Sequence, residues 1–466
     1  MSPSLRFKSR AGPRQAALAL RIESLDASRL GARRLETFWR RRHGPRNAEP
    51  QHLWRSPSAH PIIFVPARIH LNPTVAVEEM IEDNSASSLL TVIITTSVTP
   101  SIPSTELVSA ILDSFDRHCP TLNTCKVIVV FDGYDQVVDT ARLKKGCVTP
   151  QQAADFSLYK QNVKNLILDK YHQHSGDTTF THTDATAEYG SPRGPSNGVD
   201  YSISQTIDKN VTFIEPARRL GFGLAVRSAL RITETPYVWV QQHDWALISD
   251  LPIEPMLQIM KSHESDPESP IKYICLPAVR MQLYASSSDV CRFPVLKELT
   301  RSLTCDFSSP TQPETRVPLT PMYFWHDKPH LASTAHYLNR VFPTRLAMLR
   351  GDFIEDKIGQ RARAQMKVGE WTKWATWLYY PEQGKRLCLK HLKGRTWAGT
   401  ERQADKDAMW RKHNEANAAL GKEAHIEVDE RNAATATRSF HDELAQYFNK
   451  RFSKNTKLGK RHSYAI

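Results

Sequence analysis

The chain of 466 residues lacks any apolar run that approaches the roughly 20 residues of a membrane-spanning helix. The apolar stretch at residues 16–22 is too short for that role, and Arg21 interrupts it. We therefore expect a soluble protein without a transmembrane segment.

The chain also lacks the close cysteine pairs of small metal and redox sites. Its seven cysteines are an odd number, and no two of them stand in a Cys-x-x-Cys pair. This pattern argues against a zinc knuckle and against a dithiol redox centre. Core packing or free thiols are the roles that remain for Cys119, Cys125, Cys147, Cys275, Cys291, Cys305 and Cys388.

Acidic residues are scarce at both ends of the chain, so the formal charge of +13 is concentrated in these two regions. The first 60 residues contain thirteen Lys and Arg against four Asp and Glu, and six further bases from Lys450 onward are not balanced by any acid. The middle of the chain is consequently close to neutral. A near-neutral middle leaves room for a short basic strip but argues against a folded nucleic-acid surface, so we expect no nucleic-acid partner.

Both ends are predicted to be basic extensions of a folded middle. Residues 1–60 are predicted to be disordered, because apolar periodicity is absent there. With Ser, many Arg and no acid before Glu23, the same region is also compatible with an organellar transit peptide. The compartment therefore stays open between the cytoplasm and an organelle. Residues 401–466 are predicted to form a helical, basic C-terminal extension.

The middle of the chain shows the pattern of an α/β domain, expected over residues 85–400. Residues 89–95 form an apolar and β-branched run, residues 106–118 carry apolar side chains at helical spacing, and residues 126–131 form a second apolar run. A strand, a crossover helix and a strand in this order make a parallel, right-handed unit. We therefore predict a Rossmann-like α/β fold with a mixed, mainly parallel sheet flanked by helices.

A polar interruption and several further elements follow this unit. Residues 146–210 are predicted to be an insertion, with a helix near 153–171 and an exposed polar segment at 172–202 that is rich in Gly, Pro, Thr and His. Residues 299–321, rich in Ser, Thr and Pro, are expected to be loops. The other expected elements are strands at 211–215, 237–240 and 272–277, and a helix at 224–232.

The run VWVQQHDWALI, residues 238–248, places a histidine and a carboxylate at the end of an apolar strand. In open α/β sheets, ligands bind at the carboxyl ends of the strands. Asp244 is therefore placed like a residue that holds a metal or handles a phosphate. Taken alone, His243 and Asp244 could equally cap the turn that follows the strand.

Five segments in their chain order resemble the motifs of one enzyme family. They are VIITTSVTP at 92–100, VIVVFDG at 127–133, RRLGFGLAVRSAL at 218–230, YVWVQQHDW at 237–245 and GDFIEDKIGQ at 351–360. Over residues 89–395 the chain resembles nucleotide-sugar-dependent glycosyltransferases of the GT-A fold, most closely the family 2-like group.

The resemblance implies a nucleotide-sugar donor and an acceptor hydroxyl on a glycan, a protein or a lipid. Asp132 would contact uracil or ribose, and Arg218 and Arg219 would contact phosphate. The full set of nucleotide-binding residues that the resemblance implies is Thr95, Thr96, Ser97, Asp132, Arg218, Arg219 and Gly221.

The resemblance also implies the catalytic chemistry. Asp356, or else Glu355, would act as the general base and take the proton of the acceptor hydroxyl, in a direct displacement that inverts the anomeric centre. Asp244 would hold Mg²⁺ or Mn²⁺, hard cations that favour oxygen ligands and neutralise a diphosphate leaving group. His391, at the end of a β-like run, would be a further metal ligand, although a structural histidine fits this position equally well.

One departure from the family pattern opens an alternative function. The family's metal motif is Asp-any-Asp, whereas Gln242 takes the place of the first acid here. A single carboxylate holds a divalent ion less well than two. The alternative is therefore a catalytically degraded relative that binds nucleotide sugars or glycans without turnover. A third hypothesis, nucleotidyl transfer to a sugar phosphate, is less attractive because the chain has no Gly-rich opening loop with a nearby lysine.

Two further patterns have purely structural interpretations. Asp132-Gly133 after a strand is a common turn pair when it stands alone. Trp371, Trp374 and Trp377 recur at a spacing of three residues, which predicts that they share one face of a helix. Core packing is the first role expected for these three side chains, and stacking on sugar rings is the second.

Overall fold

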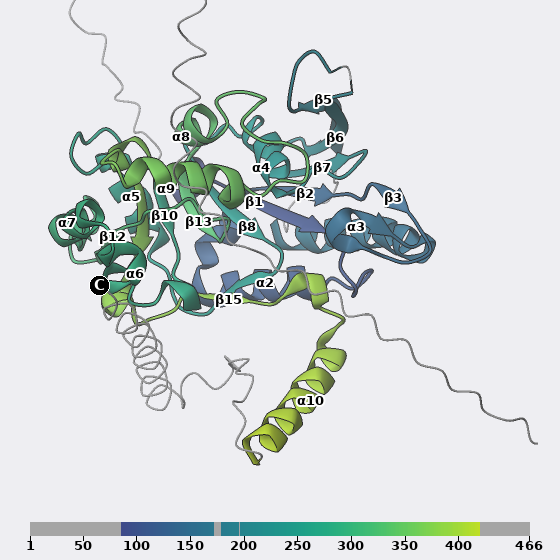
Figure 1. Cartoon of the computed structure of the whole chain (residues 1–466). Coiled ribbons are helices and arrows are strands. Elements are labelled where there is room, and N and C mark those ends of the chain that lie inside the picture. Colours follow the sequence, from purple (N-terminus) through teal and green to yellow (C-terminus); the bar gives the residue numbers. More distant parts are fainter. Residues whose placement is uncertain (1–84, 172–178, 195, 420–466) are drawn as a thin grey trace, which may run out of the picture. The chain divides into compact units, whose positions relative to one another are not determined.

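The computed structural model of the chain describes residues 85–171, 179–194 and 196–419. The described residues all belong to one unit, residues 80–466. A mixed sheet of eleven strands forms the centre of the described part, with helices packed around it (Figure 1). The predicted α/β class is confirmed. The predicted basic region at 1–60 lies outside the described residues.

The centre of the sheet is parallel. Strands β8 (Tyr237–Gln242), β1 (Leu90–Ser97), β2 (Lys126–Asp132) and β7 (Val211–Pro216) lie side by side in this order. They are almost continuously buried, as expected of parallel strands that are covered on both faces. The last residues of β1 and β2 pair with each other, so both strands end level at one edge of the sheet.

Antiparallel pairs extend the sheet on both sides of this centre. Strand β6 (Gly198–Thr206) continues from β7, and β5 (Phe180–Glu188) follows it at the margin. On the other side, β13 pairs antiparallel with β8, and a parallel pair of β10 and β14 lies farther out. The strands on that side, in spatial order, are β13 (His330–Ser333), β10 (Tyr273–Cys275), β14 (Thr376–Tyr379), β12 (Arg316–Pro321) and β11 (Cys305–Ser308).

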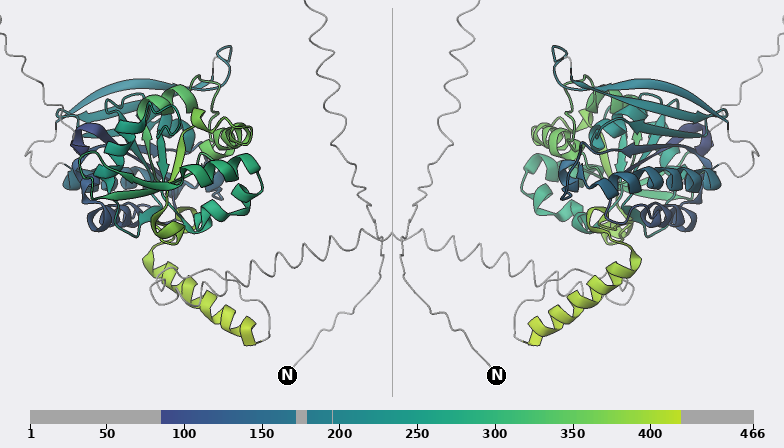
Figure 2. Two further views of the ribbon diagram at one scale, coloured as in Figure 1. Left: turned by 90° about the vertical axis from the view of Figure 1, so that its left-hand side faces the viewer. Right: turned by 90° about the vertical axis from the view of Figure 1, so that its right-hand side faces the viewer.

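The helices bury the apolar faces that the sequence pattern indicated. Helix α2 (Glu106–His118) has the predicted bounds, and its Phe115 meets Trp239 of β8 edge-on with the ring centroids 6.5 Å apart. Helix α4 (Phe222–Leu230) packs against β1 and β2, and α3 (Pro150–Tyr171) packs against β2 and β7 (Figure 2). The buried apolar residues of α2 are Leu107, Val108, Ile111, Leu112 and Phe115.

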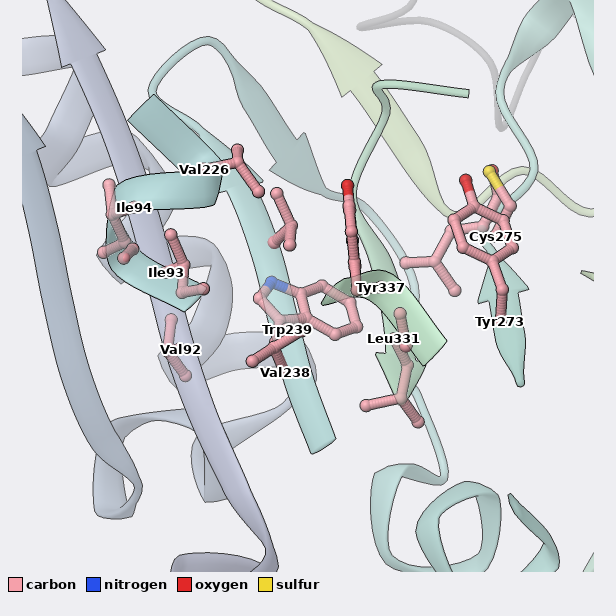
Figure 3. Close-up of a cluster of buried hydrophobic side chains, with 14 of the residues drawn as sticks. Val92, Ile93, Ile94, Val226, Val238, Trp239, Tyr273, Cys275, Leu331 and Tyr337 are labelled. Atoms are coloured by element: carbon pink, nitrogen blue, oxygen red, sulfur yellow. The ribbon is translucent and has the colours of Figure 1, made fainter. Parts of the chain in front are cut away.

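Trp239 lies within the hydrophobic core (Figure 3). Its side chain is completely buried. In Figure 3 the indole lies between Val92 and Ile93 of β1 on one side and Leu331 and Tyr337 on the other. Truncation of such a side chain typically costs roughly 3–5 kcal/mol, so this contact fixes β8 against its neighbours. The position of β8 matters because the strand leads directly to His243.

A second, two-stranded sheet returns the chain to the end of β8. It pairs β9 (Trp245–Leu247) with β15 (Leu389–His391) in antiparallel fashion. His391 is aligned with Trp245 in this register. The pairing therefore brings His391 to the residue that follows Asp244, although Asp244 and His391 are 147 positions apart in the chain.

The prediction of loops at residues 299–321 is wrong. This segment contains the end of helix α7 (Pro294–Leu303) and the whole of β11 and β12. In β12, Val317 and Leu319 are buried in alternation, and that period of two is sufficient for a short strand even among Ser, Thr and Pro. The composition of the segment masked this pattern.

The three tryptophans do not share a helical face, so that expectation is wrong. Trp371 opens a 3-10 turn, η7 (Trp371–Lys373), and Trp377 lies in β14. Ala375, with φ +51°, separates the two elements and ends any helical path between them. All three indoles are nevertheless buried, and core packing, the first role expected, holds.

The described part of the predicted insertion at 146–210 is regular. Helix α3 covers the predicted helix, and β5 and β6 occupy much of the predicted polar segment, with β5 mostly exposed as expected. In β6, Val199, Tyr201 and Ile203 are buried in alternation against the neighbouring elements. Thr-rich segments of this kind favour strands because β-branched side chains suit a pleated surface.

The remaining elements are short, apart from two helices. No helix among the described residues is both long and apolar enough to cross a bilayer. The predicted extension at 401–466 is described as far as residue 419, within α10. The remaining α-helices and strands of the described part are α1 (Ala86–Leu89), α5 (Ile253–His263), α6 (Ser288–Cys291), α8 (Thr334–His336), α9 (Gln360–Met366), α10 (Thr400–Ala419), β3 (Gln136–Val137) and β4 (Cys147–Val148).

Candidate functional site

A cavity opens where β1, β2 and β8 end, which is the position at which open α/β sheets bind ligands. We call it the central cavity. Polar, charged and aromatic side chains from distant parts of the chain meet there. It is lined by Thr95, Thr96, Ser97, Val98, Asp132, Gly133, Tyr134, Leu143, Lys144, Gly146, Val148, Arg219, Phe222, Ala225, Gln242, His243, Asp244, Phe353 and Arg395.

The central cavity gathers many of the residues that the sequence motifs indicated. Those that line it are Thr95, Thr96, Ser97, Asp132, Arg219 and Asp244. The predicted residues that are not among its lining are Arg218, Gly221, Glu355, Asp356 and His391. Arg218 is exposed and its guanidinium donates to the carbonyl of Gly198 at 3.2 Å.

The end of β1 is joined to the segment that follows β8. The backbone N–H of His243 donates to the carbonyl of Thr95 at 3.0 Å, and the N–H of Ser97 donates to Nδ1 of His243 at 3.2 Å. Because a backbone N–H can only donate, Nδ1 of this histidine is the unprotonated ring nitrogen. The hydroxyl of Thr96 is hydrogen-bonded to that of Tyr159 at 2.6 Å. Side chains and backbone thus hold this rim of the cavity in place.

Asp132 holds the loop that enters α4 as well as lining the cavity. Its Oδ1 accepts hydrogen bonds from the backbone N–H groups of Leu220 at 2.6 Å and Gly221 at 3.1 Å. Burial raises the pKa of Asp132 to about 6, although these two hydrogen bonds favour the charged form. Asp132 therefore does more than form a turn with Gly133, because its hydrogen bonds connect the end of β2 to the start of α4.

Gly221 is required by a close backbone approach between two of the motifs. Its φ is +81°, and a Cβ at this position would lie 2.4 Å from Cα of Gly351. The N–H of Gly351 also donates to the carbonyl of Leu220 at 2.7 Å. The segments 218–230 and 351–360, far apart in the chain, are consequently in direct contact beside the central cavity.

Asp244 and His391, both predicted to hold a metal, lie together. Nε2 of His391 is 3.1 Å from Oδ2 of Asp244, and the N–H of Gly394 donates to the same oxygen at 3.0 Å. Burial would raise the pKa of Asp244, but the hydrogen bond from His391 and the neighbouring histidines lower it to about 2. Trp245 stacks on the imidazole of His391 with the ring centroids 4.5 Å apart. This carboxylate is therefore anionic across the neutral range.

The donor set here suits a divalent cation only in part. No group of three or more His, Cys, Asp or Glu that could hold a metal occurs among the described residues. Asp244 and His391 offer one carboxylate oxygen and one imidazole nitrogen. Mg²⁺ is commonly bound by one or two carboxylates, with waters and substrate phosphates as its other ligands. Two protein donors at the rim of a cavity fit an ion that is completed by a bound diphosphate.

Three cationic side chains, two of them not singled out in the sequence, line the cavity. They belong to Lys144, Arg219 and Arg395. The guanidinium of Arg395 lies over the ring of Phe353 at 5.2 Å, and Phe353 stacks on Phe222 at 6.0 Å. A cavity with three cations is well suited to a ligand with several negative charges, such as a diphosphate.

The predicted catalytic acids, Glu355 and Asp356, open the π-helical segment η6 (Glu355–Gly359). Oε2 of Glu355 accepts from Nδ1 of His326 at 3.2 Å, and this hydrogen bond is the main cause that lowers the pKa of Glu355 to about 2. Asp356 is exposed. Phe353, two residues before Glu355, lines the cavity, whereas neither acid is among its lining residues.

Sequence reasoning missed the residues that pack behind Glu355. His326 and Asp327 lie between β12 and β13, beyond the predicted loop segment at 299–321, and no sequence pattern drew attention to them. Lys328 lies with its ammonium 6.0 Å from the centroid of Trp245. Arg395 is the last residue of the run 388–395 that contains His391. Its position directly after Gly394 was the only sequence feature that could have pointed to it as a cavity residue.

No protein-family model and no curated protein matches the chain. Solved structures do match. TarS of S. aureus (residues 1–349) has 10% sequence identity and a TM-score of 0.31, with 65% of this chain and 59% of that chain covered. A mannosyltransferase of Pyrobaculum calidifontis, solved with GDP-Man and Mn²⁺, has 12% identity and a TM-score of 0.29, with 65% and 60% covered.

Glucosyl-3-phosphoglycerate synthase of Mycobacterium tuberculosis, solved with Mn²⁺, UDP and its product, also matches. It has 14% identity and a TM-score of 0.22, with 55% of this chain and 60% of that chain covered. The chain is similar to GT-A glycosyltransferases. It spans about 60% of the length of these three solved chains. Because the TM-scores and identities are low, the function has to be argued from the central cavity itself.

Proposed function

We propose that this protein transfers a sugar from a nucleotide-diphosphate sugar to an acceptor hydroxyl. The observation that carries the proposal is the gathering of Asp132, Asp244 and the cations Lys144, Arg219 and Arg395 in one cavity at the carboxyl ends of the parallel strands. The donor carries a diphosphate with several negative charges. Such a ligand complements three cations and needs its charge balanced as the bond to the sugar breaks.

The nucleoside part of the donor would lie against the ends of β1 and β2. Thr95, Thr96 and Ser97 form one wall there, and Tyr134 provides an aromatic ring next to Asp132. A nucleobase combines a flat apolar face with a polar edge, and this set of side chains offers partners for both. Arg219, rather than the exposed Arg218, is the arginine of the motif that would reach the phosphates.

Asp244 and His391 would hold Mg²⁺ or Mn²⁺, with diphosphate and water oxygens as the other ligands. The bound ion would neutralise charge on the leaving nucleoside diphosphate. The hydrogen bonds from His391 and Gly394 keep Asp244 ionised and oriented in the absence of substrate. Arg395, at the same rim, adds a fixed positive charge of its own.

The transfer would invert the anomeric centre in one displacement. The acceptor oxygen forms a bond to the anomeric carbon, the bond from that carbon to the diphosphate breaks, and the acceptor proton passes to a carboxylate. Of the two candidates, Glu355 is favoured over Asp356, because His326 holds the Glu355 carboxylate in one place, whereas Asp356 is exposed. The acceptor would be a hydroxyl of a glycan, a protein or a lipid.

A second candidate function is the binding of nucleotide sugars or glycans without turnover. It is favoured by Gln242, which stands where the family has an acid. Its amide is already used, because Nε2 donates to the carbonyl of Asp327 at 2.7 Å. Gln242 therefore offers no second carboxylate to a metal, and an enzyme that had lost this acid could retain donor binding.

Release of nucleoside diphosphate distinguishes these functions. The full chain is incubated with a panel of UDP- and GDP-sugars and Mn²⁺, and free UDP and GDP are measured. An enzyme should release nucleoside diphosphate slowly from one donor even without acceptor, because water can replace the acceptor. Binding of a donor by calorimetry without release from any of them would support the binding relative instead.

Two carboxamide variants test the choice of base. Glu355→Gln should lower the release rate at least tenfold while leaving donor affinity within about twofold, since general acid–base catalysis contributes roughly 10²–10⁴-fold. Asp356→Asn should have a smaller effect. Asp139→Asn, at an exposed acid outside the cavity, is the matched control. If Asp356→Asn proves the more damaging change, the assignment of the base reverses.

A further inference from the structure

Asp327 and Glu355 are joined by two reciprocal hydrogen bonds. The N–H of Glu355 donates to Oδ1 of Asp327 at 3.1 Å, and the N–H of Asp327 donates to Oε2 of Glu355 at 3.4 Å. Each residue thus gives its backbone N–H to the carboxylate of the other. No sequence motif indicated this pair, because the two residues lie in different segments of the chain.

The first of these hydrogen bonds gives a partner to a backbone N–H in the first turn of a helix. Residues 354–366 are helical, so the N–H of Glu355 lies in a first turn and has no carbonyl partner within its own helix. Side-chain oxygens that accept from such N–H groups fix the beginning of a helix. Here the oxygen comes from Asp327, a residue of another segment, which therefore fixes the helix start against the rest of the domain.

Asp327 is also tied to the strand that ends at the central cavity. Its carbonyl accepts from Nε2 of Gln242 at 2.7 Å, and Gln242 lines the cavity. The preceding residue is held as well, because the hydroxyl of Tyr273 in β10 donates to the carbonyl of His326 at 2.9 Å. A continuous path of hydrogen bonds therefore leads from the end of β8 through Asp327 to Glu355.

The burial of Asp327 indicates that this arrangement is costly. The residue is only 4% exposed, and its Oδ2 has no hydrogen-bond partner among the described residues. Burial, together with the nearby charge of Glu355, raises the pKa of Asp327 well above its ordinary range. A buried carboxyl with one unpartnered oxygen destabilises a fold unless its other contacts compensate. Among the described residues, the hydrogen bonds of Asp327 go to Glu355 and to Gln242.

We propose that Asp327 is a positioning residue for the general base, which holds the start of the Glu355 helix at a fixed distance from the end of β8. The role of Glu355 as the base rests on the proposed function, whereas the clamp between the two residues does not. Precise placement is valuable in catalysis because a shift of about 1 Å can cost on the order of 100-fold in rate.

Two substitutions at position 327 separate positioning from simple loss of stability. Asp327→Ala removes the acceptor of the Glu355 N–H, whereas Asp327→Asn keeps an oxygen that can accept it. We expect Asp327→Ala to lower kcat about 10- to 100-fold with the donor KM within twofold, and Asp327→Asn to restore kcat to within about threefold of the wild type. If Asp327→Ala does not fold, Asp327→Ser, whose hydroxyl is too short to replace the carboxylate, takes its place.

A double variant shows whether the effect acts through Glu355. If Asp327 acts only by placing this base, Asp327→Ala should cause no further loss of kcat in a Glu355→Gln background. Multiplicative losses would overturn the proposal. Thr300→Val is the matched control, because it removes a buried hydroxyl that bonds Tyr323 at 2.6 Å, on a helix that contributes nothing to the cavity. It should change stability and leave kcat within twofold.

Amide hydrogen exchange tests the clamp without any turnover. In Asp327→Ala the amide of Glu355 should exchange at least tenfold faster than in the wild type, and in Asp327→Asn it should remain protected. Unchanged protection in Asp327→Ala would overturn the clamp even if the protein is an active transferase. Absence of nucleoside diphosphate release from the wild type would instead overturn the proposed function while the exchange result still stood.

Discussion

At the scale of single residues, Asp132 shows how burial and hydrogen bonding oppose each other. Its pKa is raised from 3.8 to about 6, so between these values the folded chain binds a proton that the unfolded chain has lost. The free energy of unfolding should therefore fall as the pH rises from 4 to 6, by up to about 3 kcal/mol from this group. Below pH 3.8 the penalty is absent, and above pH 6 it is complete.

Urea denaturation between pH 4 and 7 measures this effect. The wild type is compared with Asp132→Asn, which cannot ionise, so the difference in unfolding free energy between the two chains isolates the group. As the pH falls, the wild type should gain stability relative to the variant. A constant difference across this range would mean that the hydrogen bonds from Leu220 and Gly221 keep the carboxylate charged at low pH.

Two adjacent arginines offer a second test at the residue scale. Arg219 lines the central cavity, whereas Arg218 is exposed and bonded to the carbonyl of Gly198. Arg219→Met should weaken the binding of UDP or GDP about tenfold or more, because it removes a charged partner of the diphosphate. Arg218→Met should change affinity less than twofold. Equal losses in calorimetry would mean that only the overall charge of the segment matters.

At the scale of elements, the contact between the segments at 218–230 and 351–360 depends on glycine. Gly221→Ala would place a Cβ 2.4 Å from Cα of Gly351 at a positive φ. Gly369 also has a positive φ, +90°, but has nothing within 4 Å of its Cβ position, so Gly369→Ala carries only the backbone strain, roughly 1–3 kcal/mol. Gly221→Ala should lose clearly more unfolding free energy and also nucleotide affinity. Equal losses in urea titrations would argue that the two segments can move apart.

The elements that were predicted correctly from the sequence are those with a regular helical spacing of apolar side chains or an unbroken apolar run. Helix α2 begins and ends where its spacing indicated, and β2 was visible as an unbroken apolar run. Strand β6 and the strands within 299–321 were not predicted, because Ser, Thr and Pro between their buried side chains obscured the period of two. Trp371 and Trp377 were misread because a spacing of three cannot reveal that Ala375 has a positive φ.

The sequence indicated part of the candidate site in two ways. Asp244 was singled out because it follows the carboxyl end of a strand, where open α/β sheets bind ligands, whereas Thr95, Asp132 and Arg219 were named through the family resemblance. Lys144, Arg395 and Asp327 come from turns and loops that reach the site by tertiary packing alone. No local pattern encodes such approaches. Even His391 was found only from the resemblance, and its place beside Asp244 depends on the pairing of β9 with β15.

At the scale of the whole molecule, the proposal requires that a nucleoside diphosphate and a divalent ion bind as one unit to a cavity assembled from distant segments. A ligand that binds only the folded state stabilises it by about 2.7 kcal/mol at a concentration 100 times its Kd. UDP or GDP should therefore raise the unfolding temperature of the full chain, and Mn²⁺ should raise it further only when the nucleotide is present.

The increment from Mn²⁺ should disappear with EDTA, in Asp244→Ala and in His391→Ala. In Arg395→Met the effect of the nucleotide should shrink while the response to Mn²⁺ persists, because in the proposed complex this arginine would contact the diphosphate and not the ion. If Mn²⁺ gives the same increment in Asp244→Ala as in the wild type, the ion binds elsewhere, and the diphosphate would have to be neutralised by Lys144, Arg219 and Arg395 alone.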